Sequence, residues 1–235
     1  MAKPTKIELH VGHFGDGTGA KGHIDEVAEA RKVTKRIFEI LQANKVPSTY
    51  FEDTTSKNQT KNLNTLVSHH NKDTNGLVVS VHFNAGGDGS KAIGTEVLYY
   101  DQQALAQRLV NAISNASGLK NRGAKQNRKL AVLKNTLEPA VLLEICFVNS
   151  KIDVDLYQKN FEAICLNVAK VLASHIGWSV IDSANTKAKG RFDVVEDEGA
   201  KVWRVQSGAF KTKEEAIKAY QNSGLAYATI RGTTK

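Results

Sequence analysis

The stretch Leu77-Val-Val-Ser-Val-His-Phe-Asn-Ala85 decides the fold class of this chain. Apolar and β-branched residues dominate its first half, which is typical of a buried strand, and Asn84 followed by Gly86-Gly87 ends that strand. His82 is therefore expected at the carboxyl end of a central strand. Sites in open α/β sheets assemble at that edge, so a polar, metal-competent side chain there is a better functional candidate than one in mid-strand. Taken alone, the stretch still favours the alternative, a histidine that is hydrogen-bonded at a strand edge.

Further strands and helices are predicted on both sides of this stretch. Strands are predicted at 6–11 and 94–100, where apolar residues alternate, and also at 46–52, 130–133 and 139–148. Helices are predicted at 26–41, 61–70, 103–114 and 155–176, where apolar residues recur at helical spacing. Asn121-Arg-Gly-Ala-Lys125 is predicted to be a basic turn, and His69 and His70 are expected in solvent on a last helical turn. Strands separated by helices predict an α/β fold with a mostly parallel, twisted sheet flanked by helices.

The length of the chain predicts two unequal parts. A chain of 235 residues with 41% hydrophobic content can hold one full α/β domain and a small appendage. We place the main domain at 1–178, a polar, alanine-rich linker at 179–189 and a small α+β unit at 190–235. Within that unit a strand is predicted at 202–210, a helix at 212–223 and a second strand at 227–230.

Charge and composition limit the classes of partner. The net charge of +8 favours an acidic partner, which could be nucleic acid, a membrane surface or an anionic wall polymer, and the charge by itself does not choose among them. No run approaches about 18 apolar residues, and no apolar stretch follows the first basic residues, so we expect no membrane insertion and no export signal. Cys146 and Cys165 lie in apolar runs without CxxC spacing, which predicts buried free thiols.

Four polar residues are expected at strand ends or on the helix that follows the first strand: His13, Glu26, His82 and Glu144. Two neutral imidazoles and one carboxylate are a common ligand set for a catalytic zinc. A further carboxylate nearby can accept a proton from zinc-bound water and return it to a leaving amine. Glu144 interrupts an apolar strand, so its charge needs either an ion-pair partner or a catalytic role.

Six segments, taken in order, resemble the zinc-dependent N-acetylmuramoyl-L-alanine amidase family (amidase type 3), over roughly residues 5–176. The likeness is particularly close to the catalytic domains of endolysins from phages of Gram-positive bacteria. The segments are Val11-Gly-His-Phe-Gly15, Glu26 opening a helix, Ser80-Val-His-Phe-Asn-Ala85, Gly94-Thr-Glu-Val-Leu-Tyr-Tyr100, Asn121-Arg-Gly-Ala-Lys125 and Pro139-Ala-Val-Leu-Leu-Glu-Ile-Cys-Phe-Val-Asn149.

The resemblance implies roles for single residues. His13, Glu26 and His82 would bind one zinc per chain, and Glu144 would be the catalytic acid and base. The family often has Asp-Pro-Gly-His-Gly where this chain has His10-Val-Gly-His-Phe14, so His10 stays an alternative ligand.

Three further residues belong to the predicted site. Glu29, one helical turn after Glu26, is the alternative carboxylate ligand. Arg122 and Asn149 are candidate substrate-binding residues, each with a structural alternative as a surface charge or a strand-end hydrogen bond.

The implied activity is hydrolysis of the amide between N-acetylmuramic acid and the first L-alanine of the peptidoglycan stem. Alternatives are a zinc peptidase acting on stem peptides, a bacterial autolysin of the same family, and a non-catalytic wall-binding or nucleic-acid-binding protein. Peptidoglycan is the expected partner, and nucleic acid is not. As a phage lysin, the protein would be made in the host cytoplasm and act on the cell wall after release.

The segment Trp203-Arg-Val-Gln-Ser-Gly-Ala-Phe210, followed by Glu215-Ala216, resembles the start of a SPOR-type peptidoglycan-binding repeat. About half the usual repeat fits before Lys235. The resemblance implies that region 190–235 binds the wall, and pairing of two copies in a homodimer would complete the sheet; a structural cap on the catalytic domain is the alternative.

Overall fold

The computed structural model describes residues 3–15, 18–181, 193–197 and 202–206. The chain divides into two compact units, Met1–Val180 and Ile181–Lys235. The first unit alternates strands and helices along the chain in the order β1 (Lys6–Val11), α1 (Glu26–Ala43), β2 (Ser48–Phe51), α2 (Gln59–His70), β3 (Gly76–Asn84), β4 (Thr95–Tyr99), α3 (Gln103–Ser117), β5 (Asn121–Gln126), α4 (Ala131–Asn135), β6 (Ala140–Phe147), α5 (Lys151–Lys159) and α6 (Phe161–Ile176).

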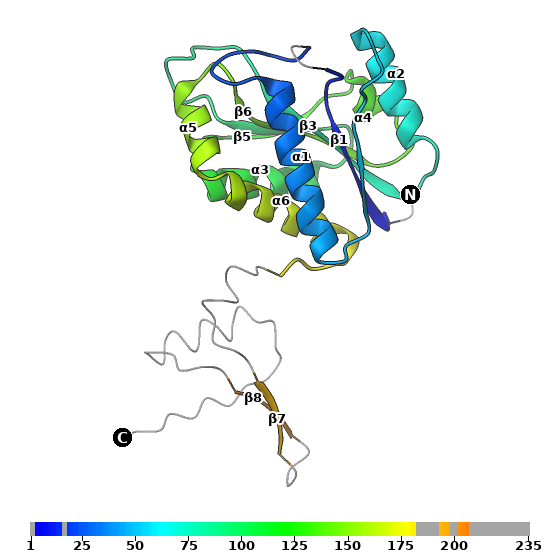
Figure 1. Cartoon of the computed structure of the whole chain (residues 1–235), viewed down its shortest axis with the longest axis vertical. Helices are drawn as coiled ribbons and strands as arrows, with labels where there is room; N and C mark the ends of the chain where they lie inside the picture. Colours follow the sequence, from blue (N-terminus) through cyan, green and yellow to red (C-terminus); the bar gives the residue numbers. More distant parts are fainter. Residues whose placement is uncertain (1–2, 16–17, 182–192, 198–201, 207–235) are drawn as a thin grey trace. The chain divides into compact units, whose positions relative to one another are not determined.

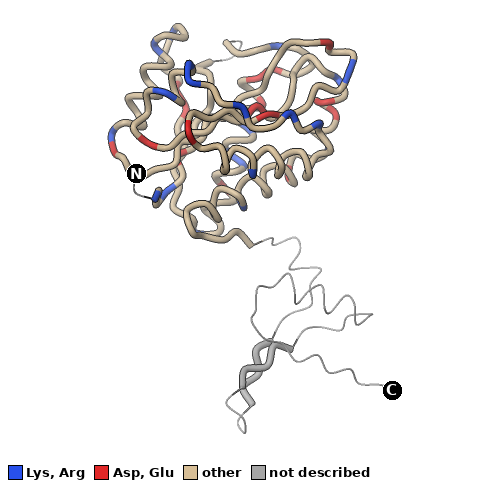
Figure 2. The backbone as a smooth tube through the Cα atoms, turned by 180° about the vertical axis from the view of Figure 1, so that it is seen from behind, with Lys and Arg blue, Asp and Glu red and all other residues tan. Residues whose placement is uncertain are grey.

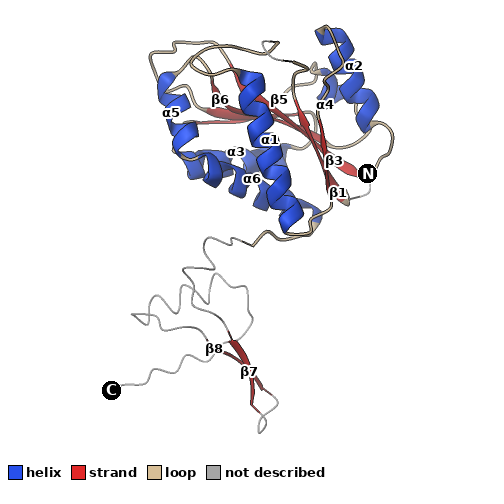
Figure 3. Ribbon diagram, in the orientation of Figure 1, coloured by secondary structure: helices blue, strands red, loops and turns tan. Residues whose placement is uncertain are grey.

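These six strands form one sheet in the order β2-β1-β3-β6-β4-β5 (Figure 3). Neighbouring strands are parallel except at β4 and β6, which are antiparallel. The predicted fold class, a mostly parallel sheet flanked by helices, is therefore confirmed. The central pair β3 and β6 brings His82 opposite Glu144 at the carboxyl end of the sheet.

The two faces of the sheet differ in polarity. Helices α1, α3, α5 and α6 cover one face and α2 and α4 the other (Figure 1). Side chains alternate between faces along a strand, so Leu9 and Val81 point into the large core under α1 and α6. Beneath α2 and α4 the apolar cluster is small, and other positions on that face carry polar side chains, among them Glu8, His10, Ser80, His82, Glu96 and Glu144.

Three predicted elements were wrong. Asn121–Gln126 is not a turn but the parallel edge strand β5, which pairs with β4 through its backbone and lacks an apolar pattern. Residues 130–133 are not a strand, because helix α4 begins at Ala131. The single helix predicted at 155–176 is two helices that meet at Asn160, whose side-chain amide donates to the Ser117 carbonyl at 3.1 Å.

The second unit contributes β7 (Asp193–Asp197) and β8 (Val202–Gln206), which pair antiparallel. Strand β8 lies within the predicted strand at 202–210, whereas the predicted helix at 212–223 and strand at 227–230 fall outside the described residues. In the described part of the chain, Cys146 and Cys165 are buried free thiols as predicted, and no helix has the length and apolar character needed to span a bilayer. Figure 2 shows lysine and arginine spread over many elements of the first unit, with acidic residues between them.

Candidate metal centre and active site

Three elements bring His13, Glu26 and His82 together. His13 lies in the loop after β1, and His82 lies near the end of β3. Glu26 is the first residue of α1, whose amino terminus is capped by Asp25 accepting from the Ala28 amide at 3.0 Å. A carboxylate is favoured there by the helix dipole, and here it also turns towards the two imidazoles.

Glu26 is the centre of this group. Its Oε1 lies 3.1 Å from His13 Nε2 and 3.0 Å from His82 Nδ1, and the two imidazole rings are 5.0 Å apart, edge to face. The amides of Phe83 and Ala20 donate to the two carboxylate oxygens at 3.1 and 2.6 Å. The carboxylate is thus held in place by backbone donors, while the imidazole nitrogens converge on it.

The pKa shifts of Glu26 and His82 favour the protonation states that metal ligands have. Burial opposes the charge of Glu26, which is 3% exposed, yet the hydrogen bonds from His13 and His82 outweigh it and lower the pKa of Glu26. Burial also lowers the pKa of His82, against the opposing effect of Glu26. An ionised carboxylate beside neutral imidazole is the protonation state that metal ligands require.

The donor set fits zinc. With zinc–ligand bonds of about 2.0–2.1 Å, ligand atoms of a tetrahedral site are about 3.3 Å apart. The nitrogen–oxygen distances of 3.0 and 3.1 Å are close to that spacing, and the ligand atoms of all three residues lie within 4.8 Å of one another. Gly12 makes room for the group, because a Cβ there would lie 2.1 Å from His82 Nε2.

The two alternative ligands lie elsewhere. His10 is fully buried on the α2 face, where its Nδ1 lies 2.8 Å from His70 Nε2. Glu29 Oε2 accepts from the Tyr157 hydroxyl at 2.7 Å on the opposite side of the sheet. Neither residue belongs to the group formed by the other three.

Glu144 lies on β6 opposite His82 on β3. Burial, with the negative charges of Glu26 and Glu96, raises the pKa of Glu144 to about 8. Its Oε2 is inaccessible and has no hydrogen-bond partner among the described residues. This carboxyl group lies next to the candidate metal ligands, has a raised pKa and has one oxygen without a hydrogen-bond partner among the described residues. Such a group is suited to accept and donate protons.

Glu96 is a member of the site that was not predicted. It lies opposite Glu144 on the antiparallel strand β4 and is 6% exposed. Arg122 Nε and Lys125 Nζ lie 2.6 and 2.5 Å from its Oε2, and although burial opposes its charge these partners lower its pKa. The only signal in the sequence was a glutamate within the alternating segment 94–100. Arg122 is thus paired with Glu96, and its guanidinium also lies 4.8 Å from the centre of the Phe147 ring.

Asn149 follows β6 and holds a neighbouring loop. Its Oδ1 accepts from the Gly86 amide at 3.0 Å, and its Nδ2 donates to the Gly86 carbonyl at 3.1 Å. A Cβ at Gly89 would lie 2.3 Å from the Asn149 carbonyl oxygen, so the loop packs directly on this residue. Of the predicted site residues, the structure brings together His13, Glu26 and His82, and it places Glu144 beside them. Arg122 and Asn149 are engaged in protein contacts at the rim.

Comparisons with known proteins found a family model, curated relatives and solved structures that this chain matches. The family model of N-acetylmuramoyl-L-alanine amidases matches residues 7–174. An uncharacterized 38.4 kDa protein of Clostridium perfringens is 36% identical over 189 residues, which are 73% of this chain and 54% of that protein. A probable cell wall amidase LytH of Staphylococcus saprophyticus is 29% identical over 161 residues, which are 66% of this chain and 53% of that protein.

The chain spans about half the length of these two curated relatives. Among solved structures, the catalytic domain of the CD27L endolysin targeting Clostridia Difficile superposes with a TM-score of 0.66 and 24% identity. That match covers 76% of this chain and 99% of the other. At this identity the superposition shows a shared fold.

Proposed function

This chain belongs to the N-acetylmuramoyl-L-alanine amidase family, and on that premise we propose that it is a peptidoglycan hydrolase. It cleaves the amide between the lactyl group of N-acetylmuramic acid and the first L-alanine of the stem peptide. The observation that carries the proposal is the convergence of His13, Glu26 and His82 at the carboxyl edge of the sheet, with Glu144 on the adjacent strand.

His13 Nε2, His82 Nδ1 and Glu26 Oε1 would hold one zinc ion per chain. When bound there, zinc would polarise the scissile carbonyl and lower the pKa of a bound water towards about 7. The amides of Phe83 and Ala20 donate to the Glu26 carboxylate and hold it in the position from which it would bind the ion.

Glu144 moves the proton. It accepts the proton that water loses as the new carbon–oxygen bond forms, and it returns that proton to the alanine nitrogen as the carbon–nitrogen bond breaks. The raised pKa of its carboxyl, about 8, favours the protonated form that the leaving amine needs. A dication bound by the three ligands would lower the pKa of Glu144 from this value.

Glu96, Arg122 and Lys125 support that role. Because Glu96 is ion-paired to both cations, it stays charged beside Glu144 and helps to keep the Glu144 pKa high. Arg122 remains a proposed substrate contact, since its side chain is 30% exposed at the rim. Asn149 remains a second proposed contact, and it also fixes the loop at Gly86.

Digestion of purified cell walls tests this function. Mass spectrometry of the products should show new amino-terminal alanine and no new reducing sugar, and His82→Ala should lose bound zinc and activity together. A different new amine would identify a peptidase, and stoichiometric zinc retained by His82→Ala would remove His82 from the ligand set.

We further propose that region 190–235 binds wall polymer as part of a homodimer, and that the protein acts as a phage lysin on the wall after release from the host cytoplasm. The proposal of wall binding is supported by the SPOR-like motif that begins at Trp203, and strand β8 includes the first residues of this motif. Two linked sites on a repetitive polymer would gain avidity without new contacts.

A further inference from the structure

Polar side chains form a line across the carboxyl end of the sheet, from the candidate metal ligands to the edge strand β5. In the register of the strands His82 lies opposite Glu144, and Glu144 lies opposite Glu96. Glu96 Oε2 then contacts Arg122 Nε at 2.6 Å and Lys125 Nζ at 2.5 Å, both on β5. The strand order β3-β6-β4-β5 therefore places the two cations beyond Glu144, on the side away from β1.

A bulge in β5 brings both cations to the same carboxylate. Residues three apart on a regular strand point to opposite faces of the sheet, so Arg122 and Lys125 would not both face Glu96. Two steps along β4 correspond here to three steps along β5 between residues 121 and 124, so β5 holds one extra residue. Gly123, within this stretch, has a φ of +85°, which glycine adopts readily. Bulges of this kind re-aim side chains and are frequent next to active sites.

Glu96 offsets only one of the two positive charges. Both cations contact the same oxygen, Oε2, while Oε1 accepts from Asn84 Nδ2 at 3.2 Å. Neither cation has another carboxylate partner among the described residues. The Lys125 ammonium has three N–H donors, of which Glu96 takes one, and the side chain is 42% exposed. A positive charge with further donors therefore faces solvent beside the active site.

Arg122 is held in place by two further contacts. Its guanidinium lies 4.8 Å from the centre of the Phe147 ring, and its Nη1 donates to the Ile93 carbonyl at 3.5 Å. The guanidinium has five N–H donors, so donors remain for a ligand after Glu96 and Ile93 are satisfied. An arginine fixed in this way loses little freedom when it binds an anion.

The order of the strands sets the direction in which the substrate lies. In the proposed reaction the scissile carbonyl lies at the ion, which His82 on β3 helps to hold, and Glu144 on β6 returns the proton to the alanine nitrogen. The departing peptide therefore extends from β6 towards β4 and β5, which follow at spacings of about 4.7–4.9 Å. In an extended peptide, the α-carboxyl group of the residue after the alanine lies about 6 Å from the alanine nitrogen. This carboxyl group therefore reaches the two cations at Glu96.

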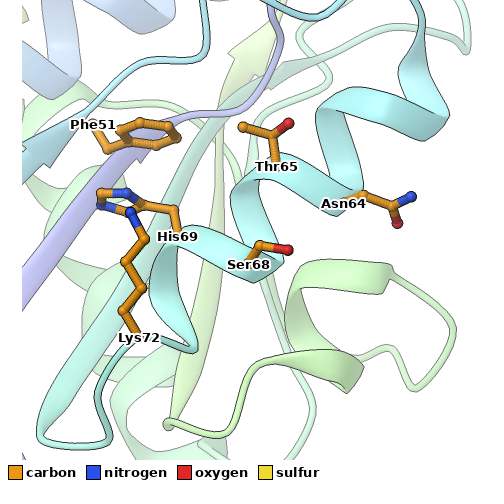
Figure 4. Close-up of a pocket in the computed structure, with 6 residues that line it drawn as sticks. All are labelled: Phe51, Asn64, Thr65, Ser68, His69 and Lys72. Atoms are coloured by element: carbon orange, nitrogen blue, oxygen red, sulfur yellow. The ribbon is translucent and has the colours of Figure 1, made fainter.

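A second polar pocket, formed by α2 and the end of β2, lies on the other side of the metal ligands (Figure 4). The His69 ring stacks there on Phe51 with centroids 3.7 Å apart, and Lys72 is the one lysine or arginine among the lining residues. Next to it, His70 was predicted to lie in solvent, but it is 1% exposed and its Nδ1 lies 2.6 Å from Glu8 Oε2. Because β2 lies beyond β1 in the sheet, this pocket is on the sugar side of the scissile bond and not on the side of the departing peptide.

We propose that Lys125 and Arg122 form a carboxylate-binding subsite for the residue that follows L-alanine in the stem peptide. That residue can carry its α-carboxyl group as a free carboxylate or as an amide, and the subsite selects the carboxylate. Neither cation contacts the reacting atoms, so both are specificity residues. The inference rests on the proposed amidase function and adds to it a preference for walls in which this carboxyl group is not amidated.

Two soluble muropeptides test the proposal on the full chain. They differ only in the α-carboxyl group of the second stem residue, which is a carboxylate in one and a carboxamide in the other, so the ratio of their kcat/KM values reports the charge. The unaltered protein should prefer the carboxylate about 10-fold, near the lower end for hydrogen bonds to charged groups, because both cations are partly exposed. Lys125→Gln should lower this preference to about 3-fold, since one of two cations remains, and Lys125→Arg should restore it.

A binding measurement does not depend on turnover. In calorimetry, the released stem peptide with the free α-carboxylate should bind about 10-fold more tightly than its amidated form, and Lys125→Gln should reduce that difference. Lys32→Gln is the matched control, because Lys32 also pairs with a glutamate, Glu29, at 2.6 Å but lies on α1. Its ratios should equal those of the unaltered protein.

The outcomes separate the subsite from the proposed function. Equal kcat/KM values for the two muropeptides, or a preference that Lys125→Gln leaves unchanged, would overturn the subsite while the amidase function stands. A Lys125→Gln variant that loses activity on both muropeptides alike would also overturn it, because Lys125 would then act only through Glu96. Cleavage of neither muropeptide by the unaltered protein would refute the proposed function, and the ratio of peptide affinities would still decide the subsite.

Discussion

Replacing Gly12 by alanine should disable the metal site through one added methyl group. A Cβ at Gly12 would lie 2.1 Å from both Cε1 and Nε2 of His82, whereas ordinary contacts begin near 3.4 Å. Gly12 has no positive φ, so the backbone itself accepts alanine and the effect is steric. The imidazole or the strand must therefore move by about 1.3 Å, the difference between 3.4 and 2.1 Å.

A displacement of this size is large on the scale of the site. A zinc–nitrogen bond is about 2.0–2.1 Å long, so a displacement of the imidazole on this scale would move Nδ1 away from the position in which it binds the ion. A misplacement of about 1 Å can lower a catalytic rate about 100-fold, and we expect at least that loss of wall hydrolysis. Overpacking should also lower the free energy of unfolding by about 1–3 kcal/mol, which leaves the protein folded.

Gly15→Ala is the matched control in the same loop. No heavy atom of the described residues lies within 4 Å of a Cβ at Gly15, and its φ is also not positive. Zinc content and release of muropeptides from purified walls should be measured for both variants, with thermal unfolding to confirm folding. If Gly12→Ala kept the zinc affinity and activity of Gly15→Ala, the steric reasoning would be refuted.

Three further predictions concern charge and domain structure. Glu144→Gln should retain zinc and fold normally but lose about 100- to 10,000-fold in turnover, because it removes the basic form of the side chain; near-normal lysis would exclude that role. Burial and the neighbouring Glu8 and Asp73 raise the pKa of Glu138 to about 7, so the folded state binds more protons than the unfolded state between about pH 4.5 and 7. The free energy of unfolding should therefore fall by about 1–3 kcal/mol as pH rises through that window, and in chemical denaturation Glu138→Gln should lack this part of the fall. Deleting everything after Ser183 should give a zinc-loaded monomer that cleaves soluble muropeptides but sediments poorly with walls, whereas the full chain should be a dimer; equal wall binding by the two would show that the tail is no wall binder.

Local patterns were enough to predict most of the fold. The apolar run before His82, the alternation at 6–11 and the helical spacing after Glu26 each depend on neighbours in sequence, and the structure has β3, β1 and α1 there. The failures were elements whose stability is not local. Strand β5 is half-exposed and polar, and it exists because the backbone of β4 supplies its hydrogen bonds.

The candidate site also has a part that the sequence predicted and a part that it did not. Positions at strand ends and at a helix start indicated His13, Glu26, His82 and Glu144, because parallel strands bring their carboxyl ends to one edge. The sequence by itself therefore determined the fold class and indicated four of the candidate side chains, but not Glu96.

The partners of those side chains required the tertiary structure. Glu96 meets Glu144 only because β4 runs antiparallel to β6, and His70 is buried only because α2 packs over the polar face of β1. Spacing along the chain cannot reveal contacts across 48 or 62 residues, since register and helix packing set which buried polar groups meet and hence which pKa values shift.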